Sequence, residues 1–370
     1  MLIPASNFIS IYLNEVIAYP VNQVAQVIAL GQVSGMIASL VGGSISDRWG
    51  HKWVLVLGVG AMTVSSLLYI FRAPWLVVAL WGLGSAGMGF AALSGQGYLT
   101  LAASAGALGF YSALYNWGYT IGGAVGTPLA AAVLGQGNFY ALGLALAGLG
   151  LFTTLMANFL PNLRPTTGSE GTKSSPSGYG ALLRRRHIFI LSMLRFLPTC
   201  YYGVMTLLPL LIKLQGGSNV AVAWYVAGSS IFASLMQLLI GRAADRWGMR
   251  LPTQIGFGAI LVAIGGMIIT GHWLWGLYIF GALGVGAAWA LATLQPGQVT
   301  LVTEPEIHGR VFGMLQLLWT LAMILGTLLG GALLEVDARL PFLIVGILNI
   351  IALALTVPFF QMKTSEPHLV

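Results

Sequence analysis

The sequence predicts an all-helical membrane protein with twelve spans, arranged as two pseudo-symmetric six-helix bundles. Of its 370 residues, 57% are hydrophobic and only 7% are charged, whereas a soluble domain carries roughly 25% charged residues. The apolar residues gather in runs that are long enough to cross a bilayer, and one charged turn occurs twice. The composition and the runs predict a lipid environment, and the repeated turn predicts the two halves.

Twelve apolar runs can form membrane spans. A helix needs about 20 apolar residues to cross ~30 Å of hydrocarbon, and it satisfies every backbone amide without water. The first run is short, because residues 2–18 reach only about 25 Å as a helix. Read between charges and turn residues, the segments are 2–18, 22–44, 53–71, 75–97, 106–134, 138–160, 188–212, 219–241, 253–271, 274–298, 309–334 and 340–361.

The basic residues predict the orientation of these spans. With both termini in the cytoplasm, twelve Lys and Arg residues fall in the inner loops and tails, and only Arg72, Lys213 and Arg339 fall outside. Such an excess of Lys and Arg marks the cytoplasmic side. We therefore expect an integral protein of the inner (plasma) membrane with cytoplasmic termini. Basic loops at a membrane surface also explain the net charge of +7 better than nucleic-acid binding does.

The chain divides at residues 161–187, a segment rich in Ser, Thr, Gly and Pro between spans six and seven. This composition is typical of a linker. It would join an N-terminal six-helix bundle (1–160) to a C-terminal one (188–363), which a cytoplasmic tail (364–370) follows. The linker ends in three arginines, 184–186, which act either as a topology determinant or as a site for lipid head groups.

Two echoes support an internal duplication. After span two the chain reads Gly43-Ser-Ile-Ser-Asp47-Arg48-Trp49-Gly50-His51-Lys52, and 198 residues later it reads Gly241-Arg-Ala-Ala-Asp245-Arg246-Trp247-Gly248-Met249-Arg250. A second echo, offset by 204, pairs Gly109, Gly122 and Gly126 with Gly313, Gly326 and Gly330. In each turn the aspartate would cap a helix N-terminus or pair with a nearby arginine. The alternative is that the motif is only a charged turn between helices. Two matched copies make this a poor explanation.

The pattern G-x-x-x-D-R-x-G-x-[KR], present in both halves, resembles the loop motif of the major facilitator superfamily of transporters. The twelve spans, the two halves and the central linker match that family over the whole chain. The resemblance implies a cavity between the halves, lined mainly by spans 1, 4, 7 and 10, and alternating access by rocking. It also implies an inner gate that contains Asp47, Arg48, Asp245 and Arg246, within a gating motif completed by Gly43, Gly50, Lys52, Gly241, Gly248 and Arg250.

Two spans bear on the direction of transport and on its coupling. Span five carries several glycines over 118–128, which is similar to the Gly- and Pro-rich helix of the family's exporters, although its Gly-Pro pair is not intact. Those glycines are equally explained by a close-packed helix face. Span four, around Trp81, lacks the arginine that many proton-coupled members carry, which weakens a proton-antiport interpretation.

Few ionisable residues lie inside the spans, where they are functional candidates by default. On span seven Arg195, Thr199, Tyr202 and Thr206 follow at helical spacing and form one polar stripe. The arginine would bind an anionic or hydrogen-bonding group through its planar fork, or it would snorkel to the inner surface. Glu15, near the outer end of span one, is either a shallow, solvated carboxylate or the first candidate for ion coupling.

Uncharged residues at mid-depth add weaker candidates, for which interhelical packing is the alternative. Together they predict a cavity low in charge and rich in aromatic surface, which suits neutral or amphipathic organic solutes. They are Asn7, Gln32, Asn116, Trp289 and Thr293.

Other chemistries find no support in the sequence. It contains no P-loop, no His cluster that would bind a metal and no nucleophile–base combination of an enzyme. The single cysteine, Cys200, lies in an apolar run and is expected to be an inert packed thiol. We therefore predict no cofactor and no metal.

The sequence thus favours a secondary transporter of a small organic solute, with efflux of a drug-like or sugar-like compound favoured over uptake. The alternatives are metabolite uptake by symport and a transport-dead membrane receptor or scaffold of the same fold. The expected partners are a small-molecule substrate, the lipid bilayer and a coupling ion, H⁺ or Na⁺. The chain is expected to be a monomer that binds no nucleic acid.

Overall fold

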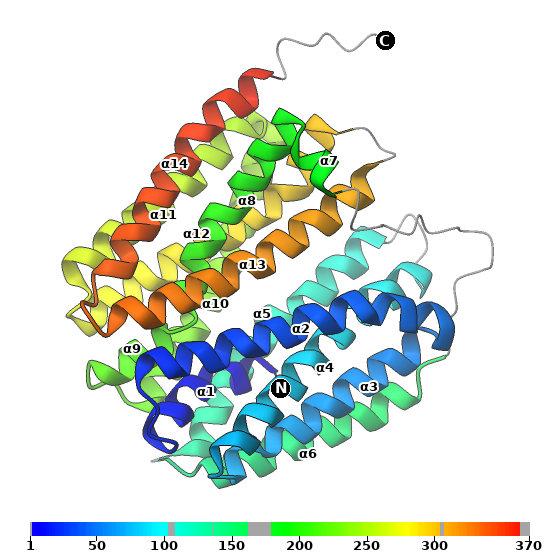
Figure 1. Cartoon of the computed structure of the whole chain (residues 1–370), viewed down its shortest axis with the longest axis vertical. Helices are drawn as coiled ribbons and strands as arrows, with labels where there is room; N and C mark the ends of the chain where they lie inside the picture. The colour runs from blue at the N-terminus through cyan, green and yellow to red at the C-terminus, as the bar shows by residue number, and fades with distance from the viewer. Residues whose placement is uncertain (1, 103–107, 136, 162–178, 304–306, 363–370) are drawn as a thin grey trace. The chain divides into compact units, whose positions relative to one another are not determined.

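The computed structural model describes residues 2–102, 108–135, 137–161, 179–303 and 307–362, and every regular element within them is a helix (Figure 1). Before the predicted linker these are α1 (Leu2–Glu15), α2 (Val21–Trp49), α3 (His51–Ser65), η1 (Ser66–Ile70), α4 (Pro74–Ala102), α5 (Leu108–Leu134) and α6 (Phe139–Asn158). After it they are α7 (Tyr179–Leu183), α8 (Arg186–Met205), α9 (Leu208–Leu214), α10 (Asn219–Trp247), α11 (Arg250–Thr270), α12 (Leu274–Val302), α13 (His308–Leu334) and α14 (Leu340–Met362).

The predicted spans all fall on these helices, which confirms the all-helical fold class. Within the described residues, ten helices are long and apolar enough to cross a membrane. The first span forms α1, which is only 14 residues long. The third is α3 continued by the 3₁₀ turn η1.

Span seven differs from the continuous helix that the sequence predicts, because it breaks into α8 and α9 after Met205. Across the break the amides of Thr206 and Leu207 donate to carbonyls three residues back. Pro209 explains the break, because its ring nitrogen has no hydrogen to donate to the carbonyl of Met205. A proline is tolerated in the first turn of the new helix, where that donor is not needed.

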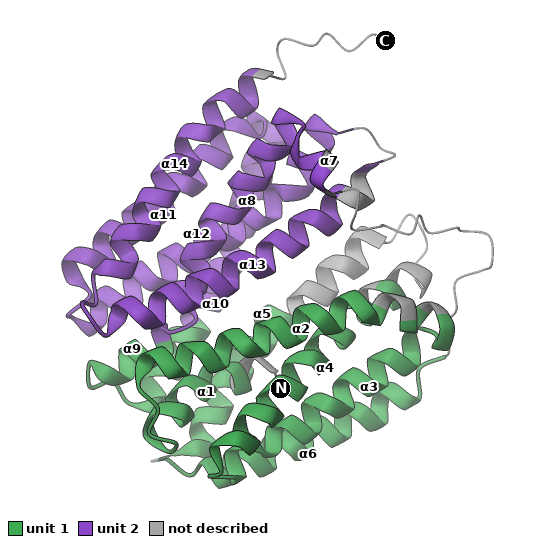
Figure 2. Cartoon of the chain, in the orientation of Figure 1, with its two compact units in different colours: residues 1–171, 209–227 green, residues 172–208, 228–370 purple. Residues whose placement is uncertain are grey.

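The chain forms two compact units, which Figure 2 distinguishes by colour. Unit 1 contains Met1–Gly171 and Pro209–Ala227, and unit 2 contains Thr172–Leu208 and Gly228–Val370. The chain therefore passes from unit 2 to unit 1 at the break in span seven, and it returns within α10. The predicted six-helix bundles stay a prediction, since residues 162–178 of the linker and the predicted tail lie outside the described residues.

Glycines set the helix spacing in unit 1. A Cβ atom added to Gly87 of α4 would lie 2.5 Å from the carbonyl oxygen of Gly58 in α3, and one added to Gly89 would lie 2.3 Å from that of Gly35 in α2. Real Cβ atoms do not approach other atoms this closely. The bare backbones of small residues let helices pack tightly where lipid gives no hydrophobic drive, so α4 is held closely by α2 and α3.

An aromatic cluster anchors the short helix α1 in the same unit. The ring of Tyr12 meets those of Tyr69 and Phe139 edge-on, with centroids 5.2 Å and 5.0 Å away. The Tyr12 hydroxyl donates to the carbonyl of Phe71, and the Tyr69 hydroxyl donates to that of Ala5. All three rings are buried. The cluster therefore joins α1 to the η1 turn and to α6.

In unit 2, α8 packs closely on α13. A Cβ atom on Gly326 would lie 2.1 Å from the carbonyl oxygen of Cys200. The hydroxyl of Thr327 donates to the carbonyl of Gly203 over 3.1 Å and lies 3.2 Å from the hydroxyl of Thr206. The contact is therefore made by backbone and small polar side chains. Cys200 is a buried free thiol, as the sequence predicted.

Candidate functional site

The two copies of the charged motif form the same kind of turn, each in its own unit. In unit 1, α2 ends at Trp49, and Gly50 follows with φ +88° while its amide donates to the carbonyl of Ser46 over 2.8 Å. In unit 2, α10 ends at Trp247 and Gly248 has φ +75°. Glycine adopts positive φ without a steric cost, so the invariant glycine of each copy lets one span stop and the next begin.

Asp245 does not cap the helix that follows it, while the capping role of Asp47 stays a prediction because its side chain lies outside the described residues. The N-cap positions of α3 and α11 are Gly50 and Met249, and no described side chain bonds either helix end. Both aspartates lie in the last turn of the preceding helix. Asp245 is exposed and has no ion-pair partner among the described residues, and the side chain of Asp47 is outside them.

Four of the motif's charges oppose the helix dipoles, whereas Arg48 and Arg246, in the last turns of α2 and α10, are favourably placed. Asp47 and Asp245 sit at helix C-termini, where the dipole is negative, while Lys52 and Arg250 sit in the first turns of α3 and α11, where it is positive. Each such placement is unfavourable by about 0.3–1 kcal/mol when exposed. Local helix stability therefore does not explain the aspartate before each turn or the basic residue after it.

The polar stripe of span seven lies within unit 2, where α8 meets α12 and α13. The Arg195 guanidinium stands over the ring of Trp319, with its carbon 6.0 Å from the ring centroid. About two turns further along α8, the rings of Tyr202 and Trp289 meet edge-on at 85° with centroids 6.2 Å apart. Thr199 is buried between these positions, and its hydroxyl donates to the Arg195 carbonyl over 2.7 Å. We call Arg195, Thr199, Tyr202, Trp289 and Trp319 the unit 2 site.

The unit 2 site lies near the middle of its helices. Trp289 is about 20 Å from either end of α12, and Trp319 is about 16 Å from the start of α13, at 1.5 Å per residue. Trp289 is nevertheless 40% exposed, and Thr293, one turn later, is exposed too. An indole and a hydroxyl thus face outward from the packed helices at mid-depth.

Arg195 is not fully satisfied where it lies. Its Nε atom is buried and has no hydrogen-bond acceptor among the described residues. Within the same residues no carboxylate pairs with the guanidinium. A desolvated cation without a counter-ion is costly in a bilayer, so this arginine is better explained by a ligand than by packing. Trp319 was missed from the sequence, because one tryptophan in an apolar span carries no distinguishing signal.

Apart from Trp289, the uncharged candidates at mid-depth do not belong to the unit 2 site. Asn7 donates to the hydroxyl of Thr127 over 3.3 Å, which joins α1 to α5 and favours the packing interpretation. Gln32 is partly buried in α2 and has a partner. The side chain of Asn116 lies outside the described residues. No described atom lies within 4 Å of a Cβ placed on Gly118 or Gly122.

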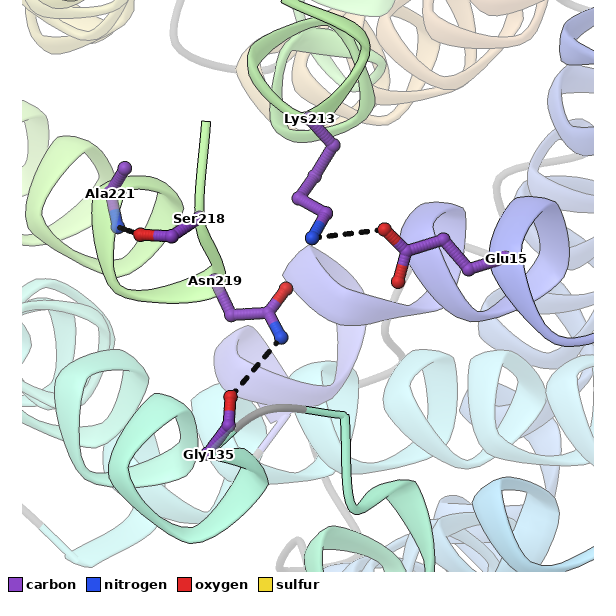
Figure 3. Close-up of polar contacts among 6 residues, drawn as sticks. All are labelled: Glu15, Gly135, Lys213, Ser218, Asn219 and Ala221. Atoms are coloured by element: carbon purple, nitrogen blue, oxygen red, sulfur yellow. Dashed lines mark hydrogen bonds and ion pairs between the residues drawn. The ribbon is translucent and has the colours of Figure 1, made fainter. Parts of the chain in front are cut away.

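A second polar cluster joins the ends of helices in unit 1 (Figure 3). The Lys213 ammonium lies 2.9 Å from a carboxylate oxygen of Glu15, and their side chains are 18% and 38% exposed. The amide of Asn219 donates to the Gly135 carbonyl over 3.4 Å. Glu15 is therefore an ion-paired carboxylate at the end of α1, and its partner, 198 residues away, was foreseen only as a basic loop residue.

The sequence model of the Major Facilitator Superfamily matches residues 3–300. An uncharacterised transporter of this superfamily, YfiS of Bacillus subtilis (strain 168), is 27% identical over 379 aligned positions, which cover 93% of this chain and 84% of YfiS. The tetracycline resistance protein, class H, of Pasteurella multocida is 26% identical over 190 positions. That match covers 50% of this chain and about half (47%) of the relative.

Two crystal structures of the nucleoside transporter NupG, one of them a point variant, are similar in fold. The TM-scores are 0.78 and 0.77, with 16% sequence identity over 97% of this chain and 96% of theirs. At that identity the likeness concerns the fold alone, but it confirms the fold that the repeated motif implied. The match to the family model over most of the sequence establishes that the chain belongs to the major facilitator superfamily of secondary transporters, which are integral membrane proteins and not enzymes.

Proposed function

We propose that this transporter exports a small organic solute by alternating access. The observation that carries the proposal is the unit 2 site, because it places a guanidinium that has no carboxylate partner among the described residues near three aromatic rings at the middle of the spans. Substrate sites of secondary transporters lie near the bilayer midplane. A pocket with few, well-placed polar groups among aromatic side chains is suited to organic solutes rather than to inorganic ions.

The twin motifs act in this proposal as a gate on the cytoplasmic side. Each aspartate lies at a helix end whose dipole disfavours a negative charge. A cation that approaches the carboxylate from another part of the protein offsets this cost, and it therefore stabilises the state in which the two groups meet. Such a contact is strengthened in one state of the cycle and lost in the other. Electrostatic contacts that exist in only one state are what bias a two-state equilibrium.

The direction of transport is supported by two observations. The relative from Pasteurella multocida is named for resistance to tetracycline, and export is one means by which a membrane transporter confers resistance to a drug. Gly118 and Gly122 of α5 have no described atom close to them, so they remain available for the export-related role that the sequence suggested.

Flux in proteoliposomes tests the function. We expect at least one aromatic organic solute from a panel that includes tetracycline to cross faster than in empty vesicles, driven by an imposed H⁺ or Na⁺ gradient or by counterflow. The double variant Asp47→Asn/Asp245→Asn is expected to lose most of that flux. Its thermal unfolding should show that it is still folded. Absence of flux under every gradient, with folded protein, would instead support a receptor or scaffold.

The segment Pro209–Ala227 acts as a weak latch at the opposite end of the spans. Its contacts group it with unit 1, although both of its chain neighbours belong to unit 2. The ion pair between Glu15 and Lys213 and the bond from Asn219 to Gly135 hold it there. A partly exposed ion pair contributes about 0.2–1 kcal/mol. A contact of this size can break in each cycle without trapping one state.

Neutralising the latch is expected to shift the conformational equilibrium by up to about fivefold, which corresponds to about 1 kcal/mol. Spin labels at Arg72→Cys and Arg339→Cys, in a Cys200→Ala background, would report the two populations. Glu15→Gln and Lys213→Gln should each shift the populations, and the double variant should add little. The swapped pair Glu15→Lys/Lys213→Glu should restore them. Additive shifts from the two single variants would show that the side chains do not interact.

A further inference from the structure

We infer that the unit 2 site selects planar aromatic carboxylates, with Arg195 binding the carboxylate and Trp319 setting the preference for a ring. The inference rests on the proposed function and narrows its substrate class. The helices that build the site, α8, α12 and α13, contain no Asp or Glu anywhere in their sequences. The fixed charge at mid-depth is therefore positive.

This sign excludes one class of solute and favours another. A cationic solute would meet Arg195 without a nearby carboxylate to offset the repulsion. An anionic solute would supply the counter-ion that the guanidinium lacks among the described residues. Arginine presents its donors in a planar fork that matches the two oxygens of a carboxylate. The same fork binds phosphate, so the rest of the site has to decide between the two groups.

The aromatic side chains of the site favour a carboxylate that carries a ring over phosphate. The Arg195 guanidinium carbon lies over the Trp319 ring, 6.0 Å from its centroid, so an aromatic surface stands beside the fork. Tyr202 lies on the same side of α8 about two turns further along, and its ring meets that of Trp289 in α12 nearly at right angles. Aromatic rings favour edge-to-face and offset contacts with another ring. A solute with its carboxylate at Arg195 therefore places a planar ring against these side chains, which a bare phosphate does not have.

Trp319 would act as a specificity-determining residue rather than as simple packing. Gln316 and Thr320, three residues before it and one after it, are a polar pair on α13, and the Thr320 hydroxyl donates to the Gln316 carbonyl over 3.2 Å. Gln316 is exposed and Trp319 is partly exposed. The turn of α13 beside Arg195 thus carries two polar side chains, one of them exposed, and a partly exposed tryptophan.

Calorimetric titration of the purified full chain in detergent tests the inference with three probes. These are 1-naphthoate, its uncharged counterpart 1-naphthamide, and the saturated decahydronaphthoate. We expect 1-naphthoate to bind at least about tenfold more tightly than either of the others. The amide loses the charge-assisted bidentate bond to Arg195, and the saturated acid loses the aromatic contact. Equal affinity for 1-naphthoate and 1-naphthamide, or no binding of 1-naphthoate, would overturn the inference.

Variants assign the two preferences to the two residues. Arg195→Gln should abolish the preference for 1-naphthoate over 1-naphthamide. Trp319→Leu should reduce the preference over the saturated probe and keep the charge preference. Arg186→Gln, at the exposed start of the same helix, is the matched control and should change neither. If Arg195→Gln fails to fold, Arg195→Lys keeps the charge without the fork and should still weaken 1-naphthoate several-fold. An unchanged affinity would contradict the assignment.

The outcomes for the two proposals can be told apart. Flux of an uncharged solute in proteoliposomes, together with no binding of 1-naphthoate, would refute the carboxylate preference and leave the transport function standing. Absence of flux for every solute, with 1-naphthoate still bound tightly, would refute transport and leave the site as that of a receptor.

Discussion

Gly326→Ala is expected to unfold the protein or to lower its stability by about 3 kcal/mol or more, while Gly122→Ala leaves the stability near that of the wild type. The two glycines are counterparts in the internal repeat, 204 residues apart. A Cβ atom on Gly326 would lie 2.1 Å from the backbone oxygen of Cys200, whereas one on Gly122 meets no described atom within 4 Å. The same chemical change is therefore made in two very different surroundings.

The cost at Gly326 arises because its neighbour is backbone. A side chain can rotate away from an added methyl group, but the carbonyl of Cys200 moves only if α8 and α13 separate. Separation would also break the bond from Thr327 to the carbonyl of Gly203. Overpacking of a close contact costs typically 1–3 kcal/mol and occasionally more, which is a large part of a usual stability of 5–15 kcal/mol.

Thermal unfolding in detergent, followed by size-exclusion elution, measures this difference. Gly326→Ala should elute as aggregate or unfold at a clearly lower temperature than the wild type. Gly122→Ala should unfold at the wild-type temperature or slightly above it, since alanine favours a helix over glycine by up to about 1 kcal/mol. Indistinguishable unfolding of the two variants would show that α8 and α13 are not packed as closely as described.

This pair also shows what a sequence can and cannot predict. The recurrence of the glycines indicates duplication, and the charge and apolar patterns locate the spans, because lipid constrains length and composition strongly. Which copy packs against a neighbour depends on the partner helix. Among the described residues, Gly326 of α13 meets the backbone of α8, whose own glycine, Gly203, lies opposite it, whereas no described atom lies within 4 Å of a Cβ on Gly122. Nothing in the sequence of span five or span eleven alone carries that information.

The site was predictable in the same partial way. Arg195, Tyr202 and Trp289 stand out as polar or aromatic residues at mid-depth, so the sequence selects them. Trp319 and Lys213 gain their meaning only from contacts with distant residues, Arg195 and Glu15. The break in span seven was predictable in hindsight from Pro209, but a proline is also tolerated inside membrane helices, as Pro198 of α8 shows.

Tyr12→Ala is expected to cost about 3–5 kcal/mol, the usual range for removing a large buried aromatic side chain. Tyr12 is 1% exposed and packs edge-on against Tyr69 and Phe139. Its hydroxyl donates to the carbonyl of Phe71. Because α1 has only 14 residues, this cluster supplies much of the packing that holds the helix in unit 1. Loss of the ring leaves a cavity that the short helix cannot fill without shifting.

Two further variants separate the ring from the hydroxyl and from general effects. Tyr12→Phe keeps the packing and loses one hydrogen bond, so it should cost only about 1 kcal/mol. Phe159→Ala removes an aromatic residue that is 80% exposed, and it should change stability by less than about 0.5 kcal/mol. Thermal unfolding should therefore show the largest loss of stability for Tyr12→Ala, a smaller loss for Tyr12→Phe and the smallest for Phe159→Ala. Equal unfolding temperatures for Tyr12→Ala and Phe159→Ala would contradict the anchoring role of the cluster.

The same substitution should reach the latch, because Glu15 lies about one helical turn beyond Tyr12 in α1. The Glu15 carboxylate and the Lys213 ammonium are 2.9 Å apart, and their contact contributes about 1 kcal/mol at most. Even a small shift of α1 lengthens that distance and weakens the contact. Tyr12→Ala should therefore move the labelled populations in the same direction as Glu15→Gln, and adding Glu15→Gln to it should move them little further. Populations that stay at wild-type values in folded Tyr12→Ala protein would show that Lys213 follows α1 when it moves, and that the latch does not depend on where the aromatic cluster places that helix.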